Sequence, residues 1–347
     1  MSGARRLLAE FGLPRVIIAL FLAALFAAAP LVQVSLAASL SDTVVRFGMN
    51  GILVLALVPM IQSGCGLNFG LPLGVLAGLL GATLSIELGL RGAGGFAAAA
   101  GLALALALLF GWLYGQLLNR VKGGEMMIAT YVGFSSVMLM SMAWLVLPYR
   151  SPTMVWGYGG EGLRTTISVE GFWLRILDDL WALRLGEELR IPTGLLLAFA
   201  AVAGLVWAFF RLRVGTAMRA VGQNPVYARA SGVDVDRMRT LSVMLSTALG
   251  ALGILAFQQS FGFIQLYDGP LYMAFPAVAA ILIGGASVTR ASLGHVLVGT
   301  FLYQGIVTMT PSVINSVMQA DMSDVIRVII GNGMILYALT RRGAEGR

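Results

Sequence analysis

The sequence predicts an all-α integral membrane protein with about ten transmembrane helices, and three observations support this fold class. Apolar residues make up 58% of the 347-residue chain and charged residues only 11%, against about 25% charged residues in soluble domains. Mean hydropathy is +0.87 over the whole length. Charge-poor apolar runs recur along the chain, and each crossing of a hydrocarbon core needs roughly 20 such residues.

Composition also excludes several classes of protein. A single cysteine excludes a disulfide scaffold. The net charge of +7 comes from basic residues that are scattered along the chain, so no nucleic-acid partner is expected. Membrane lipid is the expected surrounding. We expect one membrane domain over residues 1–347.

Each predicted span is an apolar run bounded by charged or Gly/Pro-rich residues. The first run is longer than the apolar region of a signal peptide and further spans follow it, which favours an uncleaved anchor. In chain order the predicted spans are 16–38, 47–63, 70–88, 96–118, 127–148, 191–210, 241–260, 272–288, 293–312 and 325–340.

The basic residues predict the orientation. With the N-terminus inside and ten crossings, the inner segments carry 15 of the 23 basic residues and 5 of the 16 acidic ones. This asymmetry follows the positive-inside rule and predicts two cytoplasmic termini. Residues 149–190 then form an outside loop, in which an amphipathic stretch near 171–185 predicts an interfacial helix or a docking surface for a partner. Residues 211–240 form the longest inside loop.

The predicted spans lack the residues that catalysis or ion coupling requires. Glu87 is the one Asp, Glu or Lys within them, and its spacing to Arg91 predicts an ion pair at a helix end. Carriers driven by ions usually keep an ionisable group in mid-membrane. His295 and Cys65 have no catalytic neighbours in sequence, and Lys122 does not fit a P-loop. We expect no catalytic residue, no metal and no ATP site in this chain.

Two glycine-rich segments adjoin each other early in the chain. Gly70, Gly74 and Gly78 are spaced to line one helix face, where another helix can approach closely. The segment 62–68 reads Gln-Ser-Gly-Cys-Gly-Leu-Asn and predicts a polar break between two spans. Irregular backbone at membrane depth requires protein or a water-filled cavity around it; an ordinary inner turn is the alternative.

The inside loop contains signals for a short capped helix. Asn224 is a good N-cap and Pro225 suits the first helical position. Gly232 can end the helix in the left-handed conformation, and Asp234 or Asp236 can begin the next span. Such a structured loop favours a docking element over a basic helix that rests on lipid headgroups.

This loop carries a family resemblance. The pattern G-Q-N-P-x-x-A-x-x-S-G at 222–232 strongly resembles permeases of ABC importers for simple sugars and branched-chain amino acids, with the ribose-type branch the most similar. The resemblance extends over about residues 45–340 and includes 61–74 and 282–287, with 149–190 unmatched. Asn68 departs from the family pattern, in which Asp is typical.

The resemblance implies a type II-like permease that pairs with a second permease chain, either a copy or a homologous sister, around a central pathway. Cytoplasmic ABC ATPase subunits would bind below and carry ATP and Mg²⁺, and an extracytoplasmic substrate-binding protein would deliver cargo from above. The chain would be a multi-pass protein of a bacterial inner membrane. The residues implied to couple it to the ATPase are Gly222, Gln223, Asn224, Pro225, Ala228, Arg229, Ser231 and Gly232.

The uncharged spans predict a neutral polar cargo such as a sugar, sugar alcohol or nucleoside, because an unpaired ion in a low-dielectric pathway is costly. Amides, hydroxyls and aromatic faces are the groups on offer. The candidate pathway residues are Asn50, Gln62, Ser63, Asn68, Thr130, Tyr131, Phe257, Gln258, Gln259, Phe261 and Tyr303. The alternatives are a branched-chain amino acid permease, a self-contained secondary carrier and a membrane-embedded enzyme.

Overall fold

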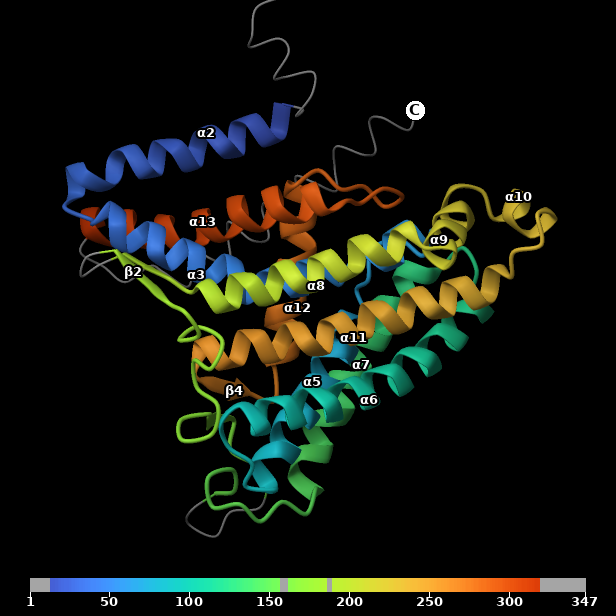
Figure 1. The fold of residues 1–347 in the computed structure, drawn as a ribbon, viewed down its shortest axis with the longest axis horizontal. Coiled ribbons are helices and arrows are strands. Elements are labelled where there is room, and N and C mark those ends of the chain that lie inside the picture. The colour runs from blue at the N-terminus through green and yellow to red at the C-terminus, as the bar shows by residue number, and fades with distance from the viewer. Residues whose placement is uncertain (1–12, 157–161, 186–188, 319–347) are drawn as a thin grey trace, which may run out of the picture.

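The computed structural model describes residues 13–156, 162–185 and 189–318. Long helices run side by side along the longest axis of the molecule, with short helices at one end and short strands at the other (Figure 1). Seven helices in the described part of the chain are long and apolar enough to cross a membrane, and α5 and α12 are apolar but shorter. The nine principal helices are α2 (Leu13–Ala28), α3 (Leu36–Leu55), α5 (Leu71–Glu87), α6 (Gly92–Arg120), α7 (Glu125–Val146), α8 (Thr193–Arg211), α11 (Val235–Phe261), α12 (Gly269–Ile283) and α13 (Leu293–Met318).

These helices confirm the all-α fold class. A helix overlaps each of the first nine predicted spans, although the second, 47–63, was predicted to begin well after the start of α3 at Leu36. The tenth, 325–340, lies outside the described residues. The predicted first span, 16–38, was wrong at its end. The chain turns at Gln33, whose φ is 61°, after the short 3-10 helix η1 (Ala29–Val32). The Ser35 hydroxyl then accepts the Ala38 N–H and begins α3. Helix α3 ends at Leu55, and the short helix α4 (Val58–Gln62) follows with Pro59 in its first turn.

Helix α11 forms the centre of the bundle and packs against α3, α5 and α6. Glycines allow the closest approaches. A Cβ atom on Gly74 would lie 2.6 Å from the Thr247 carbonyl oxygen, and one on Gly78 would lie 2.7 Å from the Ala251 carbonyl oxygen. The predicted close approach at this face of α5 is therefore confirmed, and α11 is the helix that it admits.

The end of the bundle at which α11 finishes contains two small antiparallel sheets (Figure 1). Strand β1 (Thr166–Ser168) pairs with β4 (Phe263–Gln265), which directly follows α11. Strand β2 (Leu183–Leu185) pairs with β3 (Leu189–Ile191). The interfacial helix predicted near 171–185 was wrong, because consecutive turns occupy 171–180.

The physical reason for these turns is the backbone, since Gly171, Arg175 and Trp181 all have positive φ angles that a helix cannot accommodate. The predicted pairing of Glu87 with Arg91 was also wrong. The Glu87 carboxylate accepts the backbone N–H groups of Arg150 and Ser151 at 2.9 and 3.0 Å, and thereby holds the start of this loop.

Candidate functional site

The inside loop folds as two short helices between α8 and α11. They are α9 (Arg213–Gln223) and α10 (Pro225–Ala230). The Asn224 side-chain oxygen accepts the Tyr227 N–H at 2.9 Å, and Gly232 has a φ of 81° just beyond the helix. The predicted capped helix is therefore confirmed. Asp234 provides the N-cap of α11 by accepting the Arg237 N–H at 3.0 Å.

One face of α10 is buried and the opposite face is open. Ala228 packs in a small cluster with Val221 and Val235. Val226 and Tyr227 are 78% and 69% exposed, so two large side chains on this face are open to contact. The sequence analysis did not single out these two residues, although their apolar character in a polar loop was a usable signal. Of the predicted coupling residues, six are also exposed: Gln223, Asn224, Pro225, Arg229, Ser231 and Gly232.

Gly222 joins this loop to the polar break. A Cβ atom on Gly222 would overlap the Gln62 carbonyl oxygen and lie 3.0 Å from the Gly64 backbone nitrogen. The Gln62 side-chain amide in turn donates to the Ala291 carbonyl oxygen, which lies in the segment before α13. Three segments that are distant in sequence therefore meet at Gln62: the break, the end of α9 and the residues before α13.

The break is mostly buried, with Gly64 exposed, and its polar side chains Gln62, Ser63 and Asn68 are paired. Gly64 and Gly66 adopt φ angles of 78° and 79°, which explains the glycines. Ser63, at 2% exposure, has its hydroxyl oxygen 2.7 Å from that of Ser242 in α11. The predicted break is confirmed as irregular backbone between α4 and α5.

Asn68 connects three elements at the end of the break. It is fully buried, and its amide donates to the Ser246 hydroxyl oxygen at 2.8 Å. Its carbonyl oxygen accepts the Tyr114 hydroxyl of α6 at 3.2 Å, and Ser246 donates onward to the Ala56 carbonyl oxygen at 2.6 Å. An amide both donates and accepts in this position, which a carboxylate could not do.

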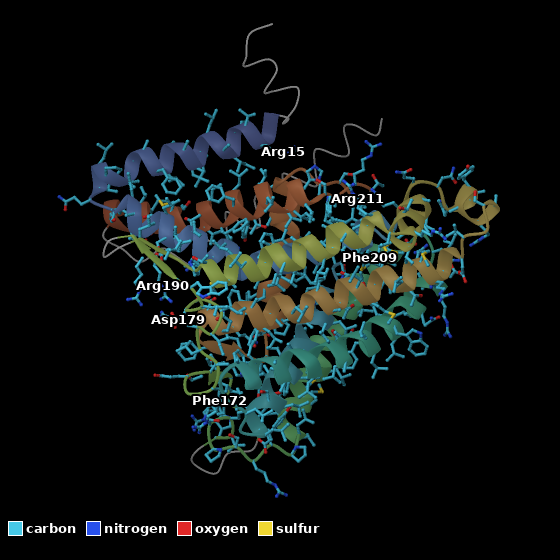
Figure 2. All side chains as sticks on the ribbon, viewed as in Figure 1. Arg15, Phe172, Asp179, Arg190, Phe209 and Arg211 are labelled. Atoms are coloured by element: carbon cyan, nitrogen blue, oxygen red, sulfur yellow. The ribbon has the colours of Figure 1, made fainter. Side chains whose placement is uncertain are left out.

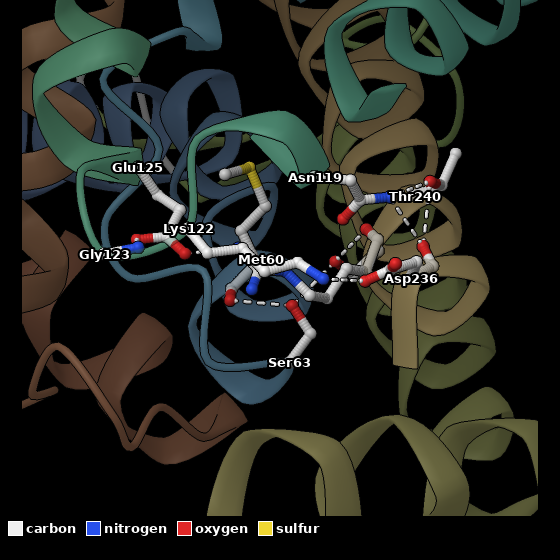
Figure 3. Close-up of polar contacts among 10 residues, drawn as sticks. Met60, Ser63, Asn119, Lys122, Gly123, Glu125, Asp236 and Thr240 are labelled. Atoms are coloured by element: carbon white, nitrogen blue, oxygen red, sulfur yellow. Dashed lines mark hydrogen bonds and ion pairs between the residues drawn. The ribbon is translucent and has the colours of Figure 1, made fainter. Parts of the chain in front are cut away.

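The polar row consists of Ser63, Asn68, Ser242 and Ser246. Charged residues extend this row toward the inside loop (Figure 3). Glu125, the first residue of α7, forms an ion pair with Arg239 of α11, and both side chains are nearly buried. Lys122 and Asp236 form a second, exposed pair at 2.7 Å. The Asn119 amide donates to the Thr240 hydroxyl at 2.9 Å. The first turns of α11 are therefore attached to α6 and α7 by charge and hydrogen bonds.

The remaining predicted pathway residues lie apart from this row. The last turns of α11 contain four of them, Phe257, Gln258, Gln259 and Phe261. The Phe257 and Phe261 rings are 5.3 Å apart, and Phe261 is exposed. Gln258 is fully buried, and neither of its amide atoms has a hydrogen-bond partner in the described part of the chain.

Gln259 forms hydrogen bonds with the loop 149–190. Its amide donates to the Asp178 carboxylate at 2.8 Å and accepts the Leu177 N–H at 3.1 Å, so it holds this loop on α11. The other four predicted residues are distributed over three helices: Asn50 is half-buried on α3, Thr130 is half-buried and Tyr131 is exposed on α7, and Tyr303 is buried on α13.

Comparison with known proteins decides the family. Residues 39–336 match the family described as branched-chain amino acid transport system / permease component. The chain belongs to this family. The part of the permease that matches includes the inside loop, the break and α11, which are the elements described above.

Curated relatives match the permease over part of its length. An autoinducer 2 import system permease protein of Klebsiella pneumoniae is 32% identical over 46% of this chain and 48% of its own. A nucleoside ABC transporter permease protein of Lactococcus lactis is 28% identical over 31% of this chain and 30% of its own. A probable ABC transporter permease protein of Escherichia coli is 29% identical over 47% and 49%. The chain thus spans about half or less of the curated relatives it matches. No solved structure matches it significantly.

Proposed function

We propose that this chain is the membrane-spanning subunit of an ATP-driven importer that moves a neutral polar solute into the cytoplasm. The observation that carries the proposal is the connection from α10 through Gly222 to the buried break. An exposed helix with two large apolar side chains suits docking to a separate ATPase, which would bind ATP and Mg²⁺. The backbone contact at Gly222 would transmit the movement of that ATPase into the spans.

The proposed orientation places the end with α9 and α10 in the cytoplasm of a bacterial inner membrane, with both termini on the same side. The excess of basic residues in the segments of that end supports it. Figure 2 shows Arg211 at this end and Arg190 and Asp179 at the opposite end of the bundle. The loop 149–190 would then face outward, toward a substrate-binding protein. Helices α6 and α7 leave most of their surface exposed in the isolated chain, which suits contact with lipid and with a second permease chain, a copy or a homologous sister.

Cysteine labelling tests this orientation. In a chain that lacks Cys65, the exposed positions Thr153 and Ser231 each receive a cysteine by Thr153→Cys or Ser231→Cys. A membrane-impermeant maleimide added to spheroplasts should label Thr153→Cys directly and Ser231→Cys only after permeabilisation. The reverse pattern would contradict the proposed topology.

Introducing negative charges on the exposed face of α10 tests whether this helix docks on the ATPase. The double variant Val226→Asp/Tyr227→Asp should lose at least about tenfold in co-purified ATPase subunit, because burying unpaired carboxylates in an interface is costly. Insertion and thermal stability should stay unchanged, since both side chains are exposed. Val214→Asp on α9 is the matched control, and equal loss of ATPase in this control would argue against a specific docking role for α10.

The proposed cargo is a sugar, sugar alcohol or nucleoside. Support comes from the names of the relatives, which include autoinducer 2 and nucleoside transport, and from aromatic rings at the outer end of α11. Phe257, Phe261 and Phe263 form a continuous row of ring contacts, with centroids 5.3 and 6.2 Å apart. Such rings can cover the apolar face of a sugar or stack on a base. Gln258, whose amide has no partner among the described residues, follows Phe257 in α11.

Uptake by the reconstituted complex tests the cargo. Vesicles that contain this chain, its ATPase and its binding protein should take up at least one of ribose, ribitol and adenosine when ATP is enclosed. Leucine is the decisive comparison, because branched-chain amino acids appear in the family description. Transport of leucine with none of the hydroxyl-rich solutes would overturn the proposed cargo class.

A further inference from the structure

A basic cavity of about 230 Å³ lies beside the inside loop, at the junction of α4, α8, α9 and the start of α13. Its lining has two arginines, one amide and one hydroxyl among apolar side chains, and it contains no acidic residue. The residues that line it are Val58, Gln62, Val206, Trp207, Phe210, Arg211, Arg219, Ser292 and Leu293.

The two arginines are held in place without a carboxylate. Arg219 donates one N–H to the Phe210 carbonyl oxygen at 2.7 Å, which uses one of the five donors of a guanidinium. The guanidinium of Arg211 lies 4.4 Å from the centre of the Trp207 ring. Neither arginine is within ion-pair distance of an acidic side chain in the described ranges. The cavity therefore has two positive charges that no described acidic side chain pairs.

The polar neighbours add donors to the same cavity. The Gln62 amide is oriented by its bond to the Ala291 carbonyl oxygen. The Ser292 hydroxyl oxygen accepts the His295 N–H at 3.3 Å, so its own O–H remains a donor. An oxyanion of compact shape is the chemistry that matches two guanidinium groups and a hydroxyl.

The rim of the cavity has the residue types that are typical of a membrane surface. Arg211 is the last residue of the apolar helix α8, and Trp207 is exposed one turn before it. Tryptophan and arginine in this arrangement are typical of the headgroup level of a bilayer. Leu205 and Leu212 are exposed as well, so apolar surface on which acyl chains could lie continues from the rim.

We propose that this cavity binds a phosphate group, carried by the headgroup of an anionic phospholipid such as phosphatidylglycerol. Basic pockets between transmembrane helices on the cytoplasmic side are suited to such headgroups. A bidentate contact from Arg211 and a second contact from Arg219 would hold the phosphate oxygens, and the acyl chains would follow α8. Free inorganic phosphate has the same chemistry and is the second possible source.

Binding to the purified full-length chain in detergent tests the proposal. Short-chain phosphatidylglycerol, phosphatidylcholine of equal chain length and inorganic phosphate are titrated separately, with affinity measured by thermophoresis. Phosphatidylglycerol should bind most tightly. Arg211→Gln should weaken it by about tenfold, and Arg211→Gln/Arg219→Gln by more. Arg213→Gln, an exposed arginine of α9 outside the cavity, should leave the affinity unchanged.

Each outcome decides one part of the proposal. Arginine-dependent binding of phosphatidylglycerol but not of inorganic phosphate establishes the lipid as the source, whereas competition by inorganic phosphate at similar affinity establishes the free ion. Arg211→Gln keeps the bond from Arg219 to Phe210, so its effect is separable from misfolding. Equal affinity in wild type and both arginine variants, or equal binding of phosphatidylcholine, would overturn the proposed anionic site.

Discussion

Replacing Gly222 by alanine is expected to abolish most ATP-driven uptake while the chain still inserts into the membrane. The added methyl group would overlap the Gln62 carbonyl oxygen and lie 2.9 Å from its carbonyl carbon. Backbone atoms cannot rotate away as a side chain can, so α9 must move from the break. Overpacking of this kind costs about 1–3 kcal/mol, and uptake in vesicles should fall at least about tenfold.

Gly204→Ala is the matched control, because a methyl group at Gly204 of α8 meets no atom within 4 Å. This control should transport normally and be slightly more stable, by about 1 kcal/mol, since alanine favours the helix over glycine. ATP hydrolysis by the complex separates two mechanisms. Hydrolysis without uptake in Gly222→Ala indicates lost coupling, whereas normal uptake would contradict the role of this contact.

The second large effect is expected at the ion pair between Glu125 and Arg239. Their side chains are only 15% and 11% exposed, so removing one partner leaves a nearly buried charge unpaired. Glu125→Gln should lower the free energy of unfolding by about 3 kcal/mol, at the lower end of the range for buried pairs. Arg239→Gln should act similarly, and the double variant should lose less than the sum of the single losses.

The exposed pair Lys122–Asp236 provides an internal comparison in the same region. Its side chains are 46% and 48% exposed, and exposed pairs contribute about 0–1 kcal/mol. Lys122→Gln should therefore change the thermal unfolding temperature in detergent very little. Equal shifts for Lys122→Gln and Glu125→Gln would show that burial does not distinguish the two pairs.

Local signals made much of the fold and part of the site predictable. Helix caps act within a few residues, so Asn224, Pro225 and Gly232 sufficed to place α10. Glycine spacing on α5 predicted a close helix approach for the same reason, although it did not identify α11 as the partner. The early boundary error had a local signal too, because Ser35 is a good N-cap that a hydropathy window does not register.

Contacts between distant segments were not predictable in this way. The hydrogen bond from Gln62 to Ala291 and the backbone contact of Gly222 depend on how the inner loops are arranged in space. Arg239, Ser242 and Ser246 are spaced to share one face of α11. Their partners could be identified only from the structure, and they are Glu125, Ser63 and Asn68. The sheet of β1 and β4 pairs residues about a hundred positions apart for the same reason.

Helix α11 connects the contacts at one end of the bundle with those at the other. It begins just after α10, runs the full length of the bundle and leads directly into β4 (Figure 1). Its 27 residues span about 40 Å, and the glycines of α5 pack closely against it. In the proposed importer, α11 would act as a lever whose two arms end at opposite membrane faces. Coupling between two binding sites is reciprocal. A protein that docks on the sheet of β1 and β4 would therefore change the affinity of α10 for the ATPase by a certain factor. The ATPase would change the affinity of that protein for the sheet by the same factor.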